Sequence, residues 1–132
     1  MDGGRLDLVI NNMDAPAFVY ENAGTPAGDS HYLQVGLEGE PPNTRGLGAR
    51  VVLTAGGRRQ YLEQSPYRGF MATVDDRLHF GLGGAVRADS LEVFWPDGRY
   101  QRLTGIDAGQ RLTVRQREAG GMPARASSAP DR

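Results

Sequence analysis

The sequence predicts an all-β domain, built as a small antiparallel β-sandwich or as a partly closed barrel. Short stretches alternate between apolar and polar residues, and no helical pattern runs for more than about ten residues. Glycine and proline, with 19 and 8 of the 132 residues, interrupt the chain too often for long helices. Several short strands separated by turns favour the sandwich or the barrel.

The first elements along the chain are two short apolar runs, at residues 7–10 and 17–21. A turn that contains Asp14 and Pro16 separates them, so each run predicts a short strand. The small, turn-rich stretch that follows predicts a linker over residues 23–30.

Clearer strands follow the linker. Residues 31–38 alternate, with every second residue apolar from Leu33 to Leu37. Two hairpins come next, because paired glycines suit a two-residue turn and Pro-Asp-Gly suits the corners of a longer one. The hairpins join residues 49–54 to 58–63 through Gly56-Gly57, and residues 91–95 to 99–103 through Pro96-Asp97-Gly98.

The remaining segments are a strand at residues 78–82 and a last strand at residues 111–115, with Leu112 and Val114 facing inward. The sequence leaves residues 65–76 undecided, as an ordered loop before a strand. A β domain over residues 31–117 is therefore expected. The small, polar and proline-punctuated segment 118–132 predicts a disordered tail.

Composition excludes several classes of function. A formal net charge of -1 argues against a nucleic-acid partner. The absence of cysteine excludes disulfides, zinc–thiolate sites and thiol nucleophiles. No apolar run approaches the roughly 20 residues of a membrane span, and the N-terminus lacks the layout of a signal peptide. If the protein is exported, we expect its signal upstream of Met1.

Four fragments, which we call the signature residues, carry a family resemblance. Together, at compatible spacings over roughly two-thirds of the chain, they resemble the ASPIC/UnbV domain of cartilage acidic protein and of many bacterial surface or secreted proteins. The fragments are Asn43 with residues 46–51, Arg68-Gly69-Phe70, residues 78–83, and Val93-Phe94-Trp95-Pro96-Asp97-Gly98.

The resemblance implies an extracellular or periplasmic parent protein, a β-rich fold, no known catalytic activity and no cofactor. In that family the domain usually follows FG-GAP or VCBS-type β-propeller repeats, and residues 4–9 are similar to the end of a propeller calcium loop. Only Gly4 and Asp7 match that pattern, whereas calcium requires about six to eight oxygen ligands. We therefore expect residues 1–22 to be a truncated last repeat without a metal site, and a calcium site is possible only in the upstream propeller.

Five residues are candidates for ligand binding: Arg50, Arg68, Asp75, His79 and Trp95. His79 lies in a predicted strand, where it is either a structural histidine or a ligand-contacting group. Trp95 is either a core anchor, since Leu91 and Val93 share its face, or an exposed platform for stacking a sugar.

Arginine side chains offer a second possible surface. They form either a cationic patch or solvated strand faces balanced by Glu38, Glu40 and Glu63, and the low net charge favours the second interpretation. The arginines concerned are Arg45, Arg50, Arg58, Arg59 and Arg68.

The sequence therefore predicts a non-catalytic accessory module, cut from the C-terminal end of a larger exported protein. Its expected roles are adhesion, binding of a carbohydrate or an extracellular protein, or capping of the upstream propeller. The alternative is a hydrolase that uses Asp75, Asp76 or Glu63 together with His79. That alternative requires at least two of these groups to converge in a pocket.

Overall fold

The structure is a computed structural model that describes residues 6–24 and 30–121. Within these ranges the chain forms ten β-strands and one short 3-10 helix, η1. The elements are β1 (Leu8–Ile10), β2 (Phe18–Tyr20), β3 (His31–Glu38), β4 (Arg50–Ala55), β5 (Arg58–Glu63), β6 (Leu78–Gly83), β7 (Arg87–Phe94), β8 (Arg99–Asp107), β9 (Gln110–Arg115), η1 (Gln116–Glu118) and β10 (Gly120–Gly121).

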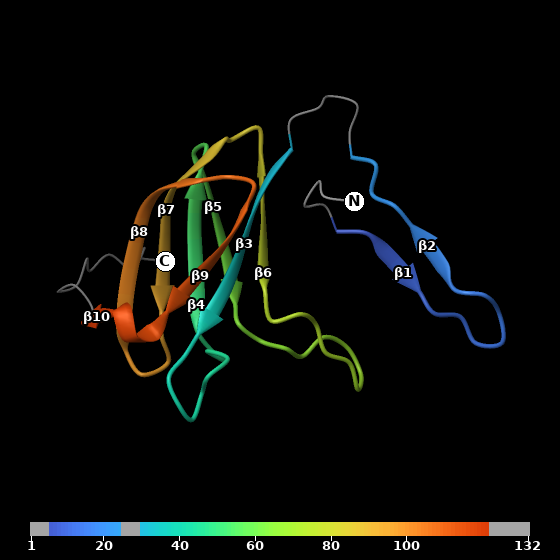
Figure 1. The fold of residues 1–132 in the computed structure, drawn as a ribbon, viewed down its shortest axis with the longest axis horizontal. Coiled ribbons are helices and arrows are strands. Elements are labelled where there is room, and N and C mark those ends of the chain that lie inside the picture. The colour runs from blue at the N-terminus through green and yellow to red at the C-terminus, as the bar shows by residue number, and fades with distance from the viewer. Residues whose placement is uncertain (1–5, 25–29, 122–132) are drawn as a thin grey trace, which may run out of the picture.

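The strands form three open sheets, which confirms the predicted all-β class. One sheet has the order β10-β8-β7-β4-β5 and a second has the order β6-β3-β9, while β1 and β2 pair only with each other. Figure 1 shows the two larger sheets facing each other as a sandwich, with the β1–β2 hairpin to one side. All pairs are antiparallel except β3 and β9, which run parallel.

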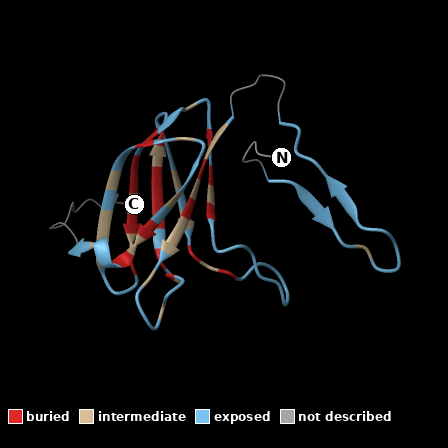
Figure 2. Cartoon of the chain, viewed as in Figure 1, coloured by how far each residue is buried: buried red, intermediate tan, exposed pale blue. Residues whose placement is uncertain are grey.

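The core lies between the two larger sheets. Alternating side chains of both sheets point inward, and Leu33, Leu53 and Phe80 are completely shielded from solvent. Figure 2 shows these buried residues gathered inside the sandwich, whereas β1 and β2 are exposed along their length. Complete burial of one such side chain contributes about 1.5–3 kcal/mol, so the sandwich supplies the apolar stabilisation of the chain.

Both predicted hairpins form. The first joins β4 to β5 with Ala55 opposite Arg58, because Gly56 and Gly57 adopt the positive φ angles of 54° and 73° that the tight turn requires. The second joins β7 to β8 with Phe94 opposite Tyr100. The strand predicted at residues 31–38 has these bounds in the structure.

The predicted tail begins too early. Gln116 to Glu118 form η1, and Gly120 and Gly121 pair with Tyr100 and Arg99 as strand β10. Two glycines carry no apolar pattern, so backbone pairing of this kind leaves no trace that alternation can detect. Residues 122–132 of the predicted tail, and residues 25–29 of the predicted linker, lie outside the described residues.

The undecided segment 65–76 is an ordered loop that folds back on itself. Tyr67 and Thr73 form an isolated antiparallel bridge, and the Val74 N–H donates to the Pro66 carbonyl at 3.0 Å. Phe70 and Met71 lie near its turn with about nine-tenths of their surface exposed.

Candidate functional site

Two of the four signature fragments, Asn43 with residues 46–51 and residues 93–98, meet at one end of the sandwich. The Asn43 side chain donates to the Leu47 carbonyl at 2.9 Å and accepts from the Leu47 N–H at 2.8 Å, which closes a tight loop. Gly46 in this loop has a φ of +63°, and a Cβ there would lie 3.0 Å from Cζ3 of Trp95. The loop therefore packs directly on Trp95 because residue 46 is glycine.

Trp95 belongs to the core, so the interpretation of this residue as an exposed stacking platform is wrong. Only 3% of its surface is exposed. Its indole Nε1–H donates to Oε1 of Gln101 at 2.9 Å, which satisfies the one polar atom of the ring. Gln101 lies on the other strand of the predicted 91–95/99–103 hairpin, so turn chemistry and alternation could have identified this partner, which the sequence analysis missed.

A polar network ties the same end together. Arg99 forms ion pairs with Glu40 and with Asp97, and the Gln116 amide donates to Asp97 at 2.9 Å. The backbone N–H of Arg99 is the largest cause of a lowered pKa at Asp97. The Glu40 N–H donates to the Gln116 side chain at 2.7 Å. These contacts join the loop after β3, the β7–β8 turn and η1. The Pro96-Asp97-Gly98 turn therefore helps to hold this end of the fold together through Asp97.

Two of the predicted ligand-binding residues, Asp75 and His79, line one hollow of about 190 Å³ on the outer side of the three-stranded sheet. The His79 ring stacks on Tyr32 with centroids 5.8 Å apart. Its Nδ1 is buried and has no hydrogen-bond partner among the described residues, and burial lowers its pKa. The imidazole is therefore biased toward its neutral form.

Asp75 is engaged by Arg77. The Arg77 Nε donates to it at 2.7 Å and the Arg77 backbone N–H at 2.9 Å, and these bonds lower the pKa of Asp75 to about 2. The carboxylate stays ionised at neutral pH and cannot serve there as a general acid. The other acids of the hydrolase alternative lie elsewhere, since Asp76 pairs with Arg45 and Glu63 is on β5.

The other candidates do not join this hollow. Arg50 lies on the outer face of the five-stranded sheet, with its guanidinium 5.6 Å from the centre of the Phe94 ring. With Val52 and Tyr61 these two residues line a shallow hollow of about 120 Å³. Arg68 donates to the Tyr67 carbonyl in the 65–76 loop. Of the five residues predicted to bind a ligand, only Asp75 and His79 thus lie in the same hollow.

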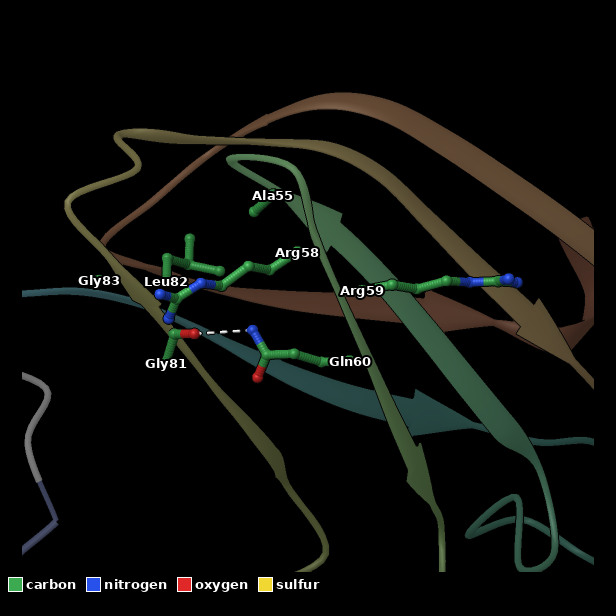
Figure 3. A pocket seen from close by; sticks show the side chains of 7 residues that line it. All are labelled: Ala55, Arg58, Arg59, Gln60, Gly81, Leu82 and Gly83. Atoms are coloured by element: carbon green, nitrogen blue, oxygen red, sulfur yellow. Dashed lines mark hydrogen bonds between the residues drawn. The ribbon is translucent and has the colours of Figure 1, made fainter.

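The five arginines considered for a cationic patch lie on different surfaces of the domain. Arg45 and Arg68 lie in loops, while Arg50 and Arg59 belong to the outer face of the five-stranded sheet. Arg58 is on the opposite face of its strand and lines a hollow of about 410 Å³ between β5 and β6 (Figure 3). Sequence reasoning treated Arg58 only as one of several surface arginines and overlooked its neighbour Gln60.

The described residues contain neither a cluster of metal-ligating side chains nor a membrane-spanning helix. No three histidine, aspartate or glutamate side chains gather there closely enough to hold a metal ion. In residues 6–24 and 30–121, no helix is long and apolar enough to cross a membrane.

No curated protein matches the chain. The family model described as ASPIC and UnbV matches residues 39–121, more than half of the sequence and a range that includes all the signature residues. This chain belongs to the ASPIC and UnbV family.

Proposed function

We propose that this chain is a non-catalytic accessory module of a larger exported protein, and that its N-terminal hairpin docks it on a β-propeller of the same polypeptide. The observation that carries this proposal is the β1–β2 hairpin, whose apolar side chains are exposed. Of the roles expected from the sequence, propeller capping accounts for these side chains most directly.

The hairpin is apolar on both faces. Its register places Leu8 opposite Tyr20 and Val9 opposite Val19, so large side chains point to both sides of the ribbon. Val19 is 72% exposed. Strands that are apolar on both faces are typical of sheets covered on both sides, and a lone two-stranded hairpin is at best marginally stable in water. The hairpin therefore suits a position inside a larger β assembly.

Asp7 closes the open end of this hairpin. Its carboxylate accepts the Asn22 backbone N–H at 2.9 Å, so a hydrogen bond joins the two ends of the segment from Asp7 to Asn22. This arrangement supports the interpretation of residues 1–22 as the last part of a propeller repeat, in which Asp7 caps the hairpin. Residues 1–5 of that segment lie outside the described residues.

A β-propeller can cover both apolar faces of the hairpin, whereas a single flat surface would cover only one. A blade offers a strand edge that can pair with β1 or β2, and neighbouring blades cover both of its faces. Because the hairpin and the sandwich are parts of one chain, docking would fix the sandwich beside the propeller. We further propose an extracellular or periplasmic location, which the family membership supports.

The test is Val19→Asp in the longer natural polypeptide and in the present chain. We expect the substitution to lower the melting temperature of the longer protein, because a charge would be buried at the docked face, and to leave the present chain unchanged. Val86→Asp is the matched control, since Val86 is similarly exposed but lies between β6 and β7. If Val19→Asp and Val86→Asp have equal effects in the longer protein, docking is refuted.

The hydrolase remains the alternative function, and one observation favours it: Asp75 and His79 share a hollow. We would assay the wild-type chain against a panel of polysaccharides and peptides, beside His79→Gln and Asp75→Asn. Turnover that both substitutions abolish would replace the proposal of a non-catalytic module.

A further inference from the structure

We propose that the hollow between the free edges of β5 and β6 binds the carboxylate of an acidic sugar, with Arg58 as its ion-pair partner. The inference is independent of how the hairpin docks. It rests on the orientation of Arg58, the charge of the lining, and a backbone donor on β6.

Arg58 faces inward from an edge strand. Alternation along β5 places Arg58, Gln60 and Leu62 on one face, and Leu62 packs against the core. In Figure 3, Arg58 and Gln60 extend toward β6, whereas Arg59 points the other way. Arg59 approaches Glu92 at 3.8 Å. Of the two arginines that line the hollow, Arg58 is thus the one whose side chain points toward β6.

The lining of the hollow has positive charge and no acid to balance it. It consists of Ala55, Arg58, Arg59, Gln60, Gly81, Leu82 and Gly83. Arg58 makes no ion pair with any residue in the described ranges, whereas Arg45, Arg77 and Arg99 are each paired with an aspartate. A guanidinium beside a buried leucine favours a planar anion that can accept two parallel hydrogen bonds.

Gly81 supplies a second donor. The Gln60 Nε2 donates to the Gly81 carbonyl at 2.7 Å, so this carbonyl points across the gap toward β5. Because the N–H and C=O of one residue lie on the same side of a strand, the Gly81 N–H also points to this free edge. A Cβ at Gly81 would point to the outer face of β6, opposite Phe80 and Leu82, and would meet no atom within 4 Å, so no side chain covers the Gly81 backbone on that face.

The hydrogen bond from Gln60 to the Gly81 carbonyl favours a compact ligand over an extended peptide. An extended peptide that added a strand to β6 would need the Gly81 carbonyl, which Gln60 already occupies. The hollow has a volume of about 410 Å³ and is lined by guanidinium, amide and peptide groups and by the side chains of Ala55 and Leu82, without an aromatic wall. A compact, hydroxylated ring with one carboxylate fits this lining, and we therefore infer a uronate.

The test is a titration of the whole chain with trigalacturonate, followed by amide shifts in two-dimensional NMR. We expect saturable shifts at Gly81 and Gly83, and binding of the methyl-esterified trisaccharide that is weaker by roughly tenfold or more, because the ester removes the charge. Arg58→Gln should weaken trigalacturonate binding similarly. The control Arg102→Gln removes one exposed arginine from β8 of the same sheet and should leave binding unchanged.

Several outcomes would overturn the inference. They are the absence of saturable shifts, equal binding of the ester, or an equal effect of Arg58→Gln and Arg102→Gln. A glutamate-rich peptide that binds the same residues more tightly than trigalacturonate would also refute it. If Arg58→Gln leaves binding intact but makes the chain self-associate, Arg58 protects a sheet edge and does not bind a ligand.

Discussion

The sandwich and the N-terminal hairpin use the same kinds of residues in opposite environments. In the sandwich, leucine, valine and phenylalanine side chains are inside, and Leu53 has no exposed surface. In the hairpin the same residue types are outside, and Leu8 is 56% exposed. Both regions have regular antiparallel pairing, so backbone hydrogen bonding does not distinguish them.

The difference lies in what covers each sheet. The five-stranded and three-stranded sheets shield each other, and removal of apolar surface from water is the dominant favourable term in folding. In the described residues, β1 and β2 pair with each other, but no second sheet packs on their faces. The stability of the present chain therefore comes from the sandwich, while the hairpin has apolar surface available for a partner.

The largest expected effect separates the two regions directly. Leu53→Ala should destabilise the chain by about 3 kcal/mol, because it opens a cavity in a shielded core. Leu8→Ala should change the free energy of unfolding by less than about 0.5 kcal/mol. Urea unfolding of both variants measures the difference. Comparable losses would mean that the hairpin already belongs to the cooperative core.

A second substitution tests how the loop that contains Asn43 and Gly46 is attached to the sandwich. Gly46→Ala should destabilise by about 2 kcal/mol, because φ is +63° and the new Cβ would lie 3.2 Å from Leu37 as well as close to Trp95. Gly57→Ala is the control, with a φ of +73° and no atom within 4 Å of its Cβ, and should cost about 1 kcal/mol. Thermal unfolding should rank the two in this order, and the reverse order would contradict the packing of the loop on Trp95.

Acid should loosen the edge of the sandwich at Asp75. Its pKa of about 2 lies below the ordinary value of 3.8, so its stabilising effect is present above pH 3.8 and is lost as the pH falls toward 2. The effect on stability should be small because the side chain is half exposed. Carboxyl chemical shifts should titrate near pH 2 in the wild type and at a higher pH in Arg77→Gln, which keeps the backbone hydrogen bond but loses those of the side chain. An unchanged midpoint in that variant would remove Arg77 as the cause.

The smallest expected effect concerns His79. Burial places its pKa below the ordinary 6.5, so the unfolded chain binds more protons in that range and stability declines as the pH falls below 6.5. An imidazole NMR titration measures the midpoint directly. A midpoint at or above 6.5 would show that His79 is solvated or paired with an acid, and would strengthen the hydrolase alternative.

Local patterns predicted the elements of the sandwich but not their partners. Alternation and turn chemistry located β3 and both central hairpins, since each signal is contained within a few residues. The parallel pairing of β3 with β9 and the pairing of Gly120-Gly121 with β8 join segments far apart in sequence. No local pattern specifies such pairings. The Trp95–Gln101 hydrogen bond is different, because it spans only six residues across a predicted hairpin and could have been found from the sequence.

The candidate site at β5 and β6 was partly readable from the sequence. Residues 58–63 were predicted as a strand, and alternation with Leu62 places Arg58 and Gln60 on the inward face. An arginine at an inward position is the signal that could have identified it. The second wall could not have been predicted, because β6 approaches β5 only through the packing of two different sheets.

The most direct test of the account is amide hydrogen exchange in the present chain and in the proposed longer polypeptide, in which a β-propeller precedes it. We expect the sandwich strands to be protected in both. Amides of Leu8–Ile10 and Phe18–Tyr20 should exchange freely in the present chain and slow by roughly a hundredfold or more in the longer protein. Equal and fast exchange of the hairpin in both proteins, or protection in the present chain that grows with its concentration, would contradict docking on a propeller.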